Sequence, residues 1–221
     1  RLSGRKRPRL LFLPTASGDS ASYAAVVTAH FGGRLGCSVE TGYILGKDTN
    51  ITTVRQLIKK ADIIYVGGGN TLRMMTAWRR TGLDKDLIKA AQAGKVLAGI
   101  SAGAICWFRY GDSDSRRFTS GIEKHIRVRG LGLIPLLFSP HHDVEKSRPA
   151  ELKRLMRHTP GIIGLGMDNC AAIEIIGKKY RIVCTRPRAS AVRAVWQKQS
   201  YLLRRLETDG KFRPLSELTD N

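Results

Sequence analysis

The sequence predicts an α/β fold: a mostly parallel β-sheet with helices on both of its faces. Short apolar runs that end in turn residues alternate with amphipathic stretches, which is the pattern of parallel strands connected by helices. The chain has 221 residues, of which 42% are hydrophobic and 25% charged, and these values are typical of one globular domain. We therefore expect a single domain that covers residues 1–221.

The first half of the chain alternates regularly between the two kinds of element. Apolar runs predict strands at residues 9–15, 37–45, 61–68 and 95–101. Apolar side chains at helical spacing predict helices at residues 22–36, 53–61, 71–82 and 83–94. Asn70 or Thr71 could cap the third of these helices. Because active sites of open α/β sheets lie at the carboxyl ends of the strands, Ser101 and the loop 67–70 belong to the functional edge.

The second half is expected to be less regular. Residues 101–108 are predicted to be helical and residues 109–121 to form a polar loop. Two extended pieces, a helix and a hairpin that turns at Gly177 and Lys178 are predicted to follow, at residues 125–135, 136–142, 148–159 and 164–184.

Charge is the most unusual feature of the composition. The chain has 38 Lys and Arg against 18 Asp and Glu, a net charge of +20, so an anionic partner has to be considered. The basic segments have no interleaved aromatic residues, and no zinc-finger or RNA-binding signature is present. A solvated basic surface is therefore favoured over a nucleic-acid site.

Cysteine spacing and hydropathy indicate the cytoplasm. The four cysteines lie far apart with no Cys-x-x-Cys pair, as expected of reduced thiols. The apolar run 10–13 is too short for a signal-peptide core, and no run approaches the roughly 20 residues that span a bilayer. We therefore expect a soluble cytoplasmic protein without membrane contact.

The most informative motif is Gly99-Ile100-Ser101-Ala102-Gly103, at the end of a predicted strand. Small residues around a serine permit the tight strand-to-helix turn of a nucleophile elbow, which exposes the serine hydroxyl. A Gly/Ala-rich turn without chemistry would have the same composition. If the motif is a nucleophile elbow, the chain must also supply a base for the serine and hydrogen-bond donors for an oxyanion.

A serine nucleophile needs a histidine base and a group that orients it. Of five histidines, His30 and His158 fall in predicted helices and His125 begins a strand, whereas His141 and His142 follow a strand end. Adjacent residues of an extended chain point in opposite directions, so one of these two would face the elbow. The orienting carboxylate could come from any of four aspartates, Asp112, Asp114, Asp143 and Asp168.

Backbone N–H groups near the elbow could stabilise the oxyanion. Gly68 and Gly69 allow close approach of the main chain, and the amide of Ala102 follows the nucleophile directly. A phosphate-binding turn is the alternative reading, but neither Gly-x-Gly-x-x-Gly nor a P-loop is present. His141, His142 and Asp143 could hold an ion, yet nothing else converges on them, so no metal or cofactor is expected.

Six segments occur in one order along the chain: PTASGDS (14–20), YVGGGNTL (65–72), AGISAGAICWF (98–108), the Asp-Ser pair of GDSDS (111–115), PHHD (140–143) and MDNCAAIEI (167–175). In this order they resemble the peptidase E-like serine peptidases of family S51. The resemblance implies a class I glutamine amidotransferase-like fold, which is a three-layer arrangement of the flavodoxin type. It also implies cleavage of dipeptides with an amino-terminal aspartate.

The resemblance also assigns roles to residues. Ser101 matches the nucleophile, His141 the base, and Asp114, rather than Asp112, the third member of the triad. Arg148 resembles the arginine that binds the side chain of the substrate aspartate, since a guanidinium group suits a carboxylate, and Asn70 is expected to contact the substrate as well.

Three expectations remain beside this assignment. Related cyanophycinases cleave an aspartate-arginine polymer, so a cyanophycinase-like or other acyl hydrolase is the alternative activity, and a nucleic-acid binder on the same scaffold is a further one. Members of the family carry an additional strand upstream of the PTAS motif, and we expect that strand to be absent here, since the chain begins at Arg1. Its absence would mean either that the native protein is longer or that the exposed sheet edge is covered, and a homo-oligomer is left open.

Overall fold

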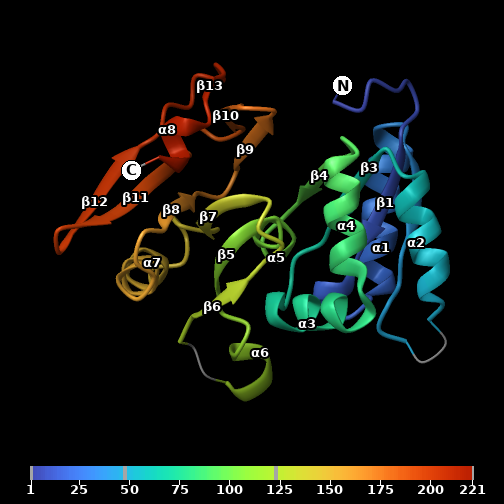
Figure 1. Ribbon diagram of the computed structural model, residues 1–221. Coiled ribbons are helices and arrows are strands. Elements are labelled where there is room, and N and C mark those ends of the chain that lie inside the picture. The colour runs from blue at the N-terminus through green and yellow to red at the C-terminus, as the bar shows by residue number, and fades with distance from the viewer. Residues whose placement is uncertain (1, 47–48, 122–123, 221) are drawn as a thin grey trace. The chain divides into compact units, whose positions relative to one another are not determined.

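The computed structural model describes residues 2–46, 49–121 and 124–220. The chain divides into two compact units (Figure 1). The first unit takes in the chain up to Trp107 and a short segment from Ser115; the second takes in Phe108–Asp114 and the remainder of the chain. The expectation of one domain stays a prediction. Among the described residues, no helix is both long and apolar enough to cross a bilayer.

The first unit is built on a four-stranded parallel sheet in the order β2-β1-β3-β4. Its strands are β1 (Arg9–Leu13), β2 (Ser38–Thr41), β3 (Ile63–Val66) and β4 (Val96–Gly99). Each lies within a segment that the sequence predicts to be a strand, so the prediction of parallel strands is confirmed for this half of the chain.

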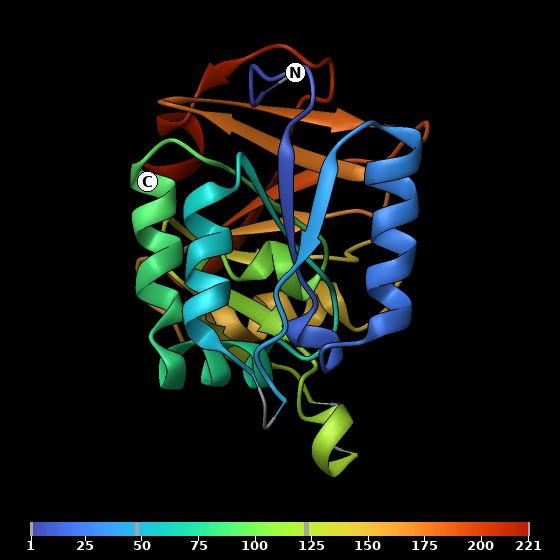
Figure 2. The ribbon, with the colours of Figure 1, turned by 90° about the vertical axis from the view of Figure 1, so that its right-hand side faces the viewer.

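Helices cover both faces of this sheet. The helices of the described part of this unit are α1 (Ala21–Val27), extended by a π-helical segment (Thr28–Arg34), α2 (Ile51–Lys60), α3 (Thr71–Thr81), α4 (Leu83–Gln92), α5 (Ala102–Ile105) and a short α6 (Arg117–Ser120), with a 3-10 turn (Thr15–Ser17) after β1. Phe12 packs in one buried cluster with Ala24 of α1, whereas Leu11 and Val54 of α2 meet at the opposite face beside Gly42. Figure 2 shows α1 on one side of the strands, with α2 and α4 on the other.

The second unit contains a six-stranded sheet in the order β12-β11-β8-β7-β5-β6. These strands are β5 (Phe108–Ser113), β6 (Ile126–Arg129), β7 (Ile134–Ser139), β8 (Ile163–Met167), β11 (Ala191–Gln197) and β12 (Ser200–Arg205). The strands β5, β7 and β8 are parallel, and the flanking strands pair antiparallel. Helix α7 (Arg148–Arg157) covers the sheet through Leu152 and Met156, which pack in one cluster with Leu137.

A small antiparallel sheet completes the second unit. It consists of β9 (Ala171–Ile176), β10 (Lys179–Cys184) and β13 (Arg213–Pro214), and the helix α8 (Ser216–Thr219) follows. The predicted hairpin turn at Gly177 and Lys178 is confirmed.

The region after the elbow differs from the prediction. The helix expected at 101–108 ends at Ile105, and the expected polar loop begins with strand β5, which lies between β7 and β6 in the sheet. Polar residues conceal this strand in the sequence, because Asp112 and Ser113 are 0% and 2% exposed. Buried polar side chains that bond to one another do not produce the hydrophobic pattern by which strands are recognised.

Candidate active site

Ser101 occupies a strained turn between β4 and α5. Its backbone has φ 53° and ψ −116°, a conformation that a residue with a side chain adopts only when its surroundings impose it. Its carbonyl oxygen accepts from the N–H groups of Ala104 and Ile105, each at 2.9 Å, so helix α5 begins directly at the serine. This is the strand-turn-helix geometry of a nucleophile elbow.

Two glycines make the turn sterically possible. A Cβ on Gly99 would lie 2.1 Å from the carbonyl oxygen of Gly103, and a Cβ on Gly103 would lie 2.1 Å from that of Val66. The start of α5 is therefore pressed against the end of strand β3. The glycines of the motif are needed for this close approach of the main chain.

The glycine-rich loop after β3 lies beside the serine. A Cβ on Gly68 would be 3.4 Å from the Cβ of Ser101. Gly69 has φ 134°, and a Cβ there would lie 2.3 Å from the carbonyl oxygen of Ala16. The loop can take this path only with glycine.

Donors without partners lie around the serine. Across the described part of the chain, the N–H groups of Gly68, Gly69 and Ala102 donate to no protein acceptor. The flanking N–H groups are bonded, that of Gly67 to the carbonyl oxygen of Leu13 at 3.1 Å and that of Asn70 to Ala16 at 2.8 Å. Unbonded N–H groups beside a serine hydroxyl could receive an oxyanion.

Asn70 is the N-cap of α3, as the sequence indicates. Its Oδ1 accepts from the N–H of Arg73 at 2.9 Å, and its Nδ2 donates to the carbonyl oxygen of Ser115 at 3.1 Å. Both ends of the buried amide thus stabilise the first unit. A direct contact with substrate stays a prediction for this residue.

His141 follows strand β7 and has φ 57°. Its Nδ1 lies 2.7 Å from Oδ1 of Asn169, which follows strand β8. An amide oxygen can only accept, so Nδ1 carries the hydrogen and the lone pair of the ring is on Nε2. The structure therefore holds His141 in the tautomer that a general base needs.

The third member of the predicted triad stays a prediction, and the structure gives His141 a different neighbour. Asn169, and neither Asp112 nor Asp114, accepts from Nδ1 of His141. Asp112 is fully buried and bonded to His125 at 2.6 Å, and Asp114 directly follows strand β5. The search of the sequence for an orienting carboxylate missed Asn169, whose signal was its place after the apolar run 162–167, in the segment MDNC.

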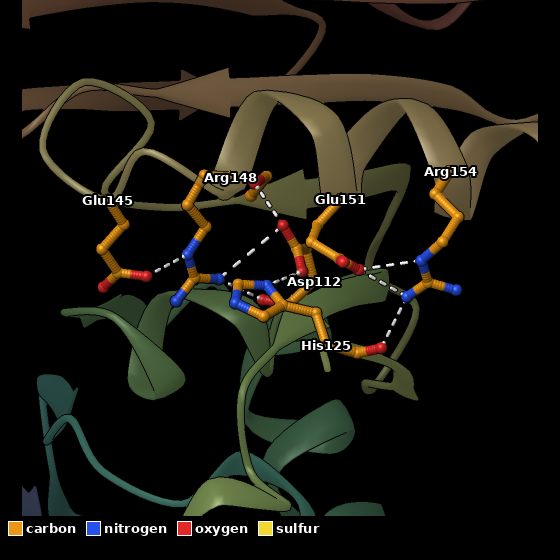
Figure 3. Close-up of polar contacts among 7 residues, drawn as sticks. Asp112, His125, Glu145, Arg148, Glu151 and Arg154 are labelled. Carbon is orange, nitrogen blue, oxygen red and sulfur yellow. Dashed lines mark hydrogen bonds and ion pairs between the residues drawn. The ribbon is translucent and has the colours of Figure 1, made fainter. Parts of the chain in front are cut away.

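Arg148 lies in a buried polar network with Asp112, shown in Figure 3. Its Nε donates to Glu145 at 2.5 Å, and its Nη1 donates to the carbonyl oxygen of Asp112 at 2.8 Å. The Asp112 carboxylate also accepts from the hydroxyl of Ser139 at 2.7 Å. At 2% exposed, Arg148 has its guanidinium group in the interior of the second unit.

His142 has surroundings different from those of its neighbour. Its ring packs on strand β8, where a Cβ on Gly166 would lie 2.9 Å from it, and burial lowers the pKa of this histidine. The neighbouring Asp143 accepts from the N–H of Asn169 and pairs with Arg186. The three residues considered for an ion thus have separate contacts. Among the described residues, no group of three or more His, Cys, Asp or Glu could hold a metal.

The predicted site residues are divided between the two units. Ser101, Gly68, Gly69, Asn70 and Ala102 lie in the first unit, where the structure gathers the serine with its donors. The second unit contains His141, Asp114 and Arg148, together with Asn169.

Comparisons with known proteins identify the family. The model of the family described as "Peptidase family S51" matches residues 1–183. The uncharacterized peptidase YgaJ of Bacillus subtilis (strain 168) is 37% identical over 194 residues, 87% of this chain and 80% of that protein. Peptidase E of Streptomyces coelicolor is 32% identical over 137 residues, 61% of this chain and 51% of that protein.

Solved structures support the same α/β fold. A peptidase from an acI-B1 Actinobacterium superimposes with a TM-score of 0.70 at 22% identity, covering 93% of this chain and 83% of its own. A putative peptidase E from Listeria monocytogenes superimposes with a TM-score of 0.57 at 20% identity, covering 94% of this chain and 89% of its own. With the family match over most of its length, the chain belongs to peptidase family S51 and is a serine peptidase.

Proposed function

We propose that this peptidase hydrolyses dipeptides with an amino-terminal aspartate, with Ser101 as nucleophile and His141 as general base. The observation that carries the proposal is the strained Ser101 beside the unbonded N–H groups of Gly68, Gly69 and Ala102. The relative from Streptomyces coelicolor, named peptidase E, supports the substrate class that the sequence motifs imply. The reaction requires Ser101 of the first unit to act with His141 of the second.

The mechanism is acyl transfer through the serine. The Oγ of Ser101 attacks the peptide carbonyl carbon while its proton passes to Nε2 of His141. The N–H groups of Gly69 and Ala102, with Gly68, stabilise the negative oxygen that forms. His141 then returns the proton to the leaving amine. Water, activated by the same histidine, hydrolyses the acyl-enzyme and releases aspartate.

Asn169 would take the orienting role. Its Oδ1 fixes the hydrogen of His141 on Nδ1, so that Nε2 carries the lone pair that would accept the serine proton. A neutral amide orients the ring as a carboxylate does, but it gives less stabilisation to the positive imidazolium that forms in the reaction.

Arg148 remains the candidate for the side-chain carboxylate of the substrate aspartate. Two of its three nitrogens, Nε and Nη1, already donate within the second unit. The remaining nitrogen, Nη2, would bind the carboxylate. Asn70 would help to place the substrate through α3, whose first turn it caps.

The test is release of p-nitroaniline from aspartyl-p-nitroanilide, beside the leucyl and glutamyl substrates as controls. We expect aspartate-selective release by the wild type and its loss in Ser101→Ala, with an unchanged circular dichroism spectrum. A fluorophosphonate should label Ser101 in the wild type and react far more slowly with His141→Ala. Activity that survives in folded Ser101→Ala would refute the assignment.

A cyanophycinase-like activity is the second candidate. The cyanophycinase of Geminocystis herdmanii is 28% identical over 140 residues, 56% of this chain and 49% of that protein. Product analysis on an aspartate-arginine polymer and on aspartyl dipeptides separates the two activities. Release of β-aspartyl-arginine without cleavage of the dipeptides would favour this candidate.

A further inference from the structure

An ion pair on the surface of the second unit holds both backbone polar groups of Asn169. Oδ1 of Asp143 accepts from the N–H of Asn169 at 2.8 Å, while its Oδ2 pairs with Nη2 of Arg186. The same nitrogen of Arg186 donates to the carbonyl oxygen of Asn169 at 3.5 Å. Asp143 itself lies two residues after His141, whose ring bonds to the side chain of Asn169.

We propose that Asp143 and Arg186 are positioning residues for His141 and act through Asn169. The inference rests on the proposed function, in which His141 is the general base. We refer to the pair as the Asp143–Arg186 clamp. These contacts form a closed ring. The ring of His141 bonds to the side chain of Asn169, and the N–H of Asn169 donates to Asp143. Two peptide units then connect Asp143 back to His141.

The neighbours of Asn169 are held by other contacts. On one side, Asp168 accepts from the N–H and the hydroxyl of Ser190 at 2.9 and 2.8 Å. On the other, the carbonyl oxygen of Cys170 accepts from the N–H of Thr185 at 2.9 Å. Among the described residues, only the clamp bonds to the main chain of Asn169. Without the clamp, the main chain at Asn169 would be restrained less, by its two neighbours and by the turn bond from the N–H of Ala171 to the carbonyl oxygen of Asp168 at 3.2 Å.

The direction of the Asn169 side chain depends on the backbone conformation of that residue. A rotation of its backbone would move Oδ1 away from Nδ1 of His141, the ring contact that the structure gives at 2.7 Å. His141 has φ 57° and lies just after strand β7, so the contact with Asn169 is one of the restraints on the plane of its ring. Displacement of a catalytic group by about 1 Å can lower a rate as much as a hundredfold.

The clamp is charged at neutral pH but exposed. Burial would raise the pKa of Asp143, but the hydrogen bonds from Asn169 and Arg186 outweigh it and hold this pKa below its ordinary value. The Arg186 side chain is 47% exposed and that of Asp143 is 21% exposed. Exposed ion pairs contribute little to global stability. Loss of the clamp should therefore reduce catalysis more than stability.

Kinetics of four variants test the clamp. We expect Asp143→Ala, which loses both contacts, to lower kcat about tenfold with KM changed less than about twofold. Arg186→Ala should lower kcat by a smaller factor than Asp143→Ala does. Arg186→Lys, which keeps the charge, should recover much of the kcat that Arg186→Ala loses. Asp143→Asn keeps an acceptor for the Asn169 N–H, and its kcat should lie between those of the wild type and Asp143→Ala.

The chain offers a matched control. Arg213 pairs with Asp209 at 2.8 Å in the same unit, with side chains 24% and 35% exposed, and its hydrogen bonds go to Asp209 and Lys211, away from the turn at Asn169. Arg213→Ala removes a comparable surface ion pair. We expect its kcat to equal that of the wild type, which separates loss of an ion pair in general from loss of this one.

A measurement that needs no substrate distinguishes the clamp from the proposed function. We expect the Nδ1 proton of His141 to give a low-field NMR resonance in the wild type, since Asn169 accepts its hydrogen bond. The resonance should broaden or move in Asp143→Ala and Arg186→Ala, but not in Arg213→Ala. If aspartyl substrates are not cleaved, the proposed function fails while this measurement still tests the clamp. An unchanged resonance and unchanged kcat in folded Arg186→Ala and Asp143→Asn would overturn the inference.

Discussion

In the proposed mechanism, Asn169 takes the place where serine hydrolases commonly have a carboxylate. Either group can fix the hydrogen of the histidine on Nδ1, but only a carboxylate neutralises the imidazolium that forms during the reaction. The contact of Oδ1 with Nδ1, at 2.7 Å, depends on the orientation of the amide. If the amide were turned so that Nδ2 faced the ring, it would donate to Nδ1 of His141 and favour the unproductive tautomer.

Asn169→Asp tests this difference. We expect the acid limb of the kcat/KM profile to move to higher pH, because a carboxylate stabilises protonated His141 and the base is then lost earlier on acidification. Asn169→Ala should lower kcat about a hundredfold without such a movement. The measurement is kcat/KM between pH 5 and 9. A profile of Asn169→Asp that superimposes on that of the wild type would contradict the orienting role.

The residues of the site could be predicted from sequence to different degrees. Ser101 and its glycines form one short segment, so their geometry follows from local sterics. His141 could be found by its place at the end of a strand. Asn169 could not, because an amide does not titrate and its role depends on a contact with a residue 28 positions away.

At the level of the elements, the elbow depends on close packing of α5 against β3. A Cβ on Gly103 would meet main-chain atoms of Val66 and Gly67, which cannot move aside as the end of a flexible side chain can. The geometry of Ser101 is thus determined by the contact of two elements as well as by its own turn.

Gly103→Ala should therefore destabilise the first unit and inactivate the enzyme. Overpacking of this kind costs about 3 kcal/mol in the free energy of unfolding. Gly33→Ala is the matched control, because nothing lies within 4 Å of its Cβ position and its φ is not positive. We expect it to change that free energy by less than about 1 kcal/mol. Urea unfolding measures both, and equal stabilities would contradict the packing argument.

Strand β5 shows why the second unit was harder to predict than the first. The strands of the first unit carry apolar runs, and their order follows the alternation of strands and helices. Strand β5 carries Asp112, whose burial is compensated by His125, Ser139 and Arg148 from three other parts of the chain. Such compensation is a tertiary property, and no local pattern reports it.

For the whole molecule, buried titratable groups limit the pH range of maximum stability. On the acid side, burial lowers the pKa of His142, and hydrogen bonds lower that of Asp62 and Asp143 despite partial burial. In each case the unfolded chain binds protons more readily than the folded one. Stability should therefore fall as the pH decreases below about 6.5, and again below about 4.

On the basic side, two tyrosines and a buried cysteine limit the pH range of maximum stability. Burial raises the pKa of Tyr65 and that of Tyr201 to about 12 each, and burial also raises the pKa of the Cys106 thiol. Above about pH 8.5 the unfolded chain releases the Cys106 thiol proton, and above about pH 10 the phenol protons, which the folded chain retains, so stability should decrease in these two steps as the pH rises.

Tyr201→Phe tests the basic limit in particular. The hydroxyl of Tyr201 is buried and bonds to no atom of the residues that the structure describes, so its removal costs no hydrogen bond. We expect Tyr201→Phe to be as stable as the wild type at pH 8, or more so, and to lose less stability between pH 10 and 12, as measured by urea unfolding. Tyr65→Phe should likewise reduce the loss of unfolding free energy between pH 10 and 12. In the double variant the two reductions should add, because the residues lie in different units. If the double variant loses stability as steeply as the wild type, other groups, of which Cys106 is the first candidate, set the basic limit.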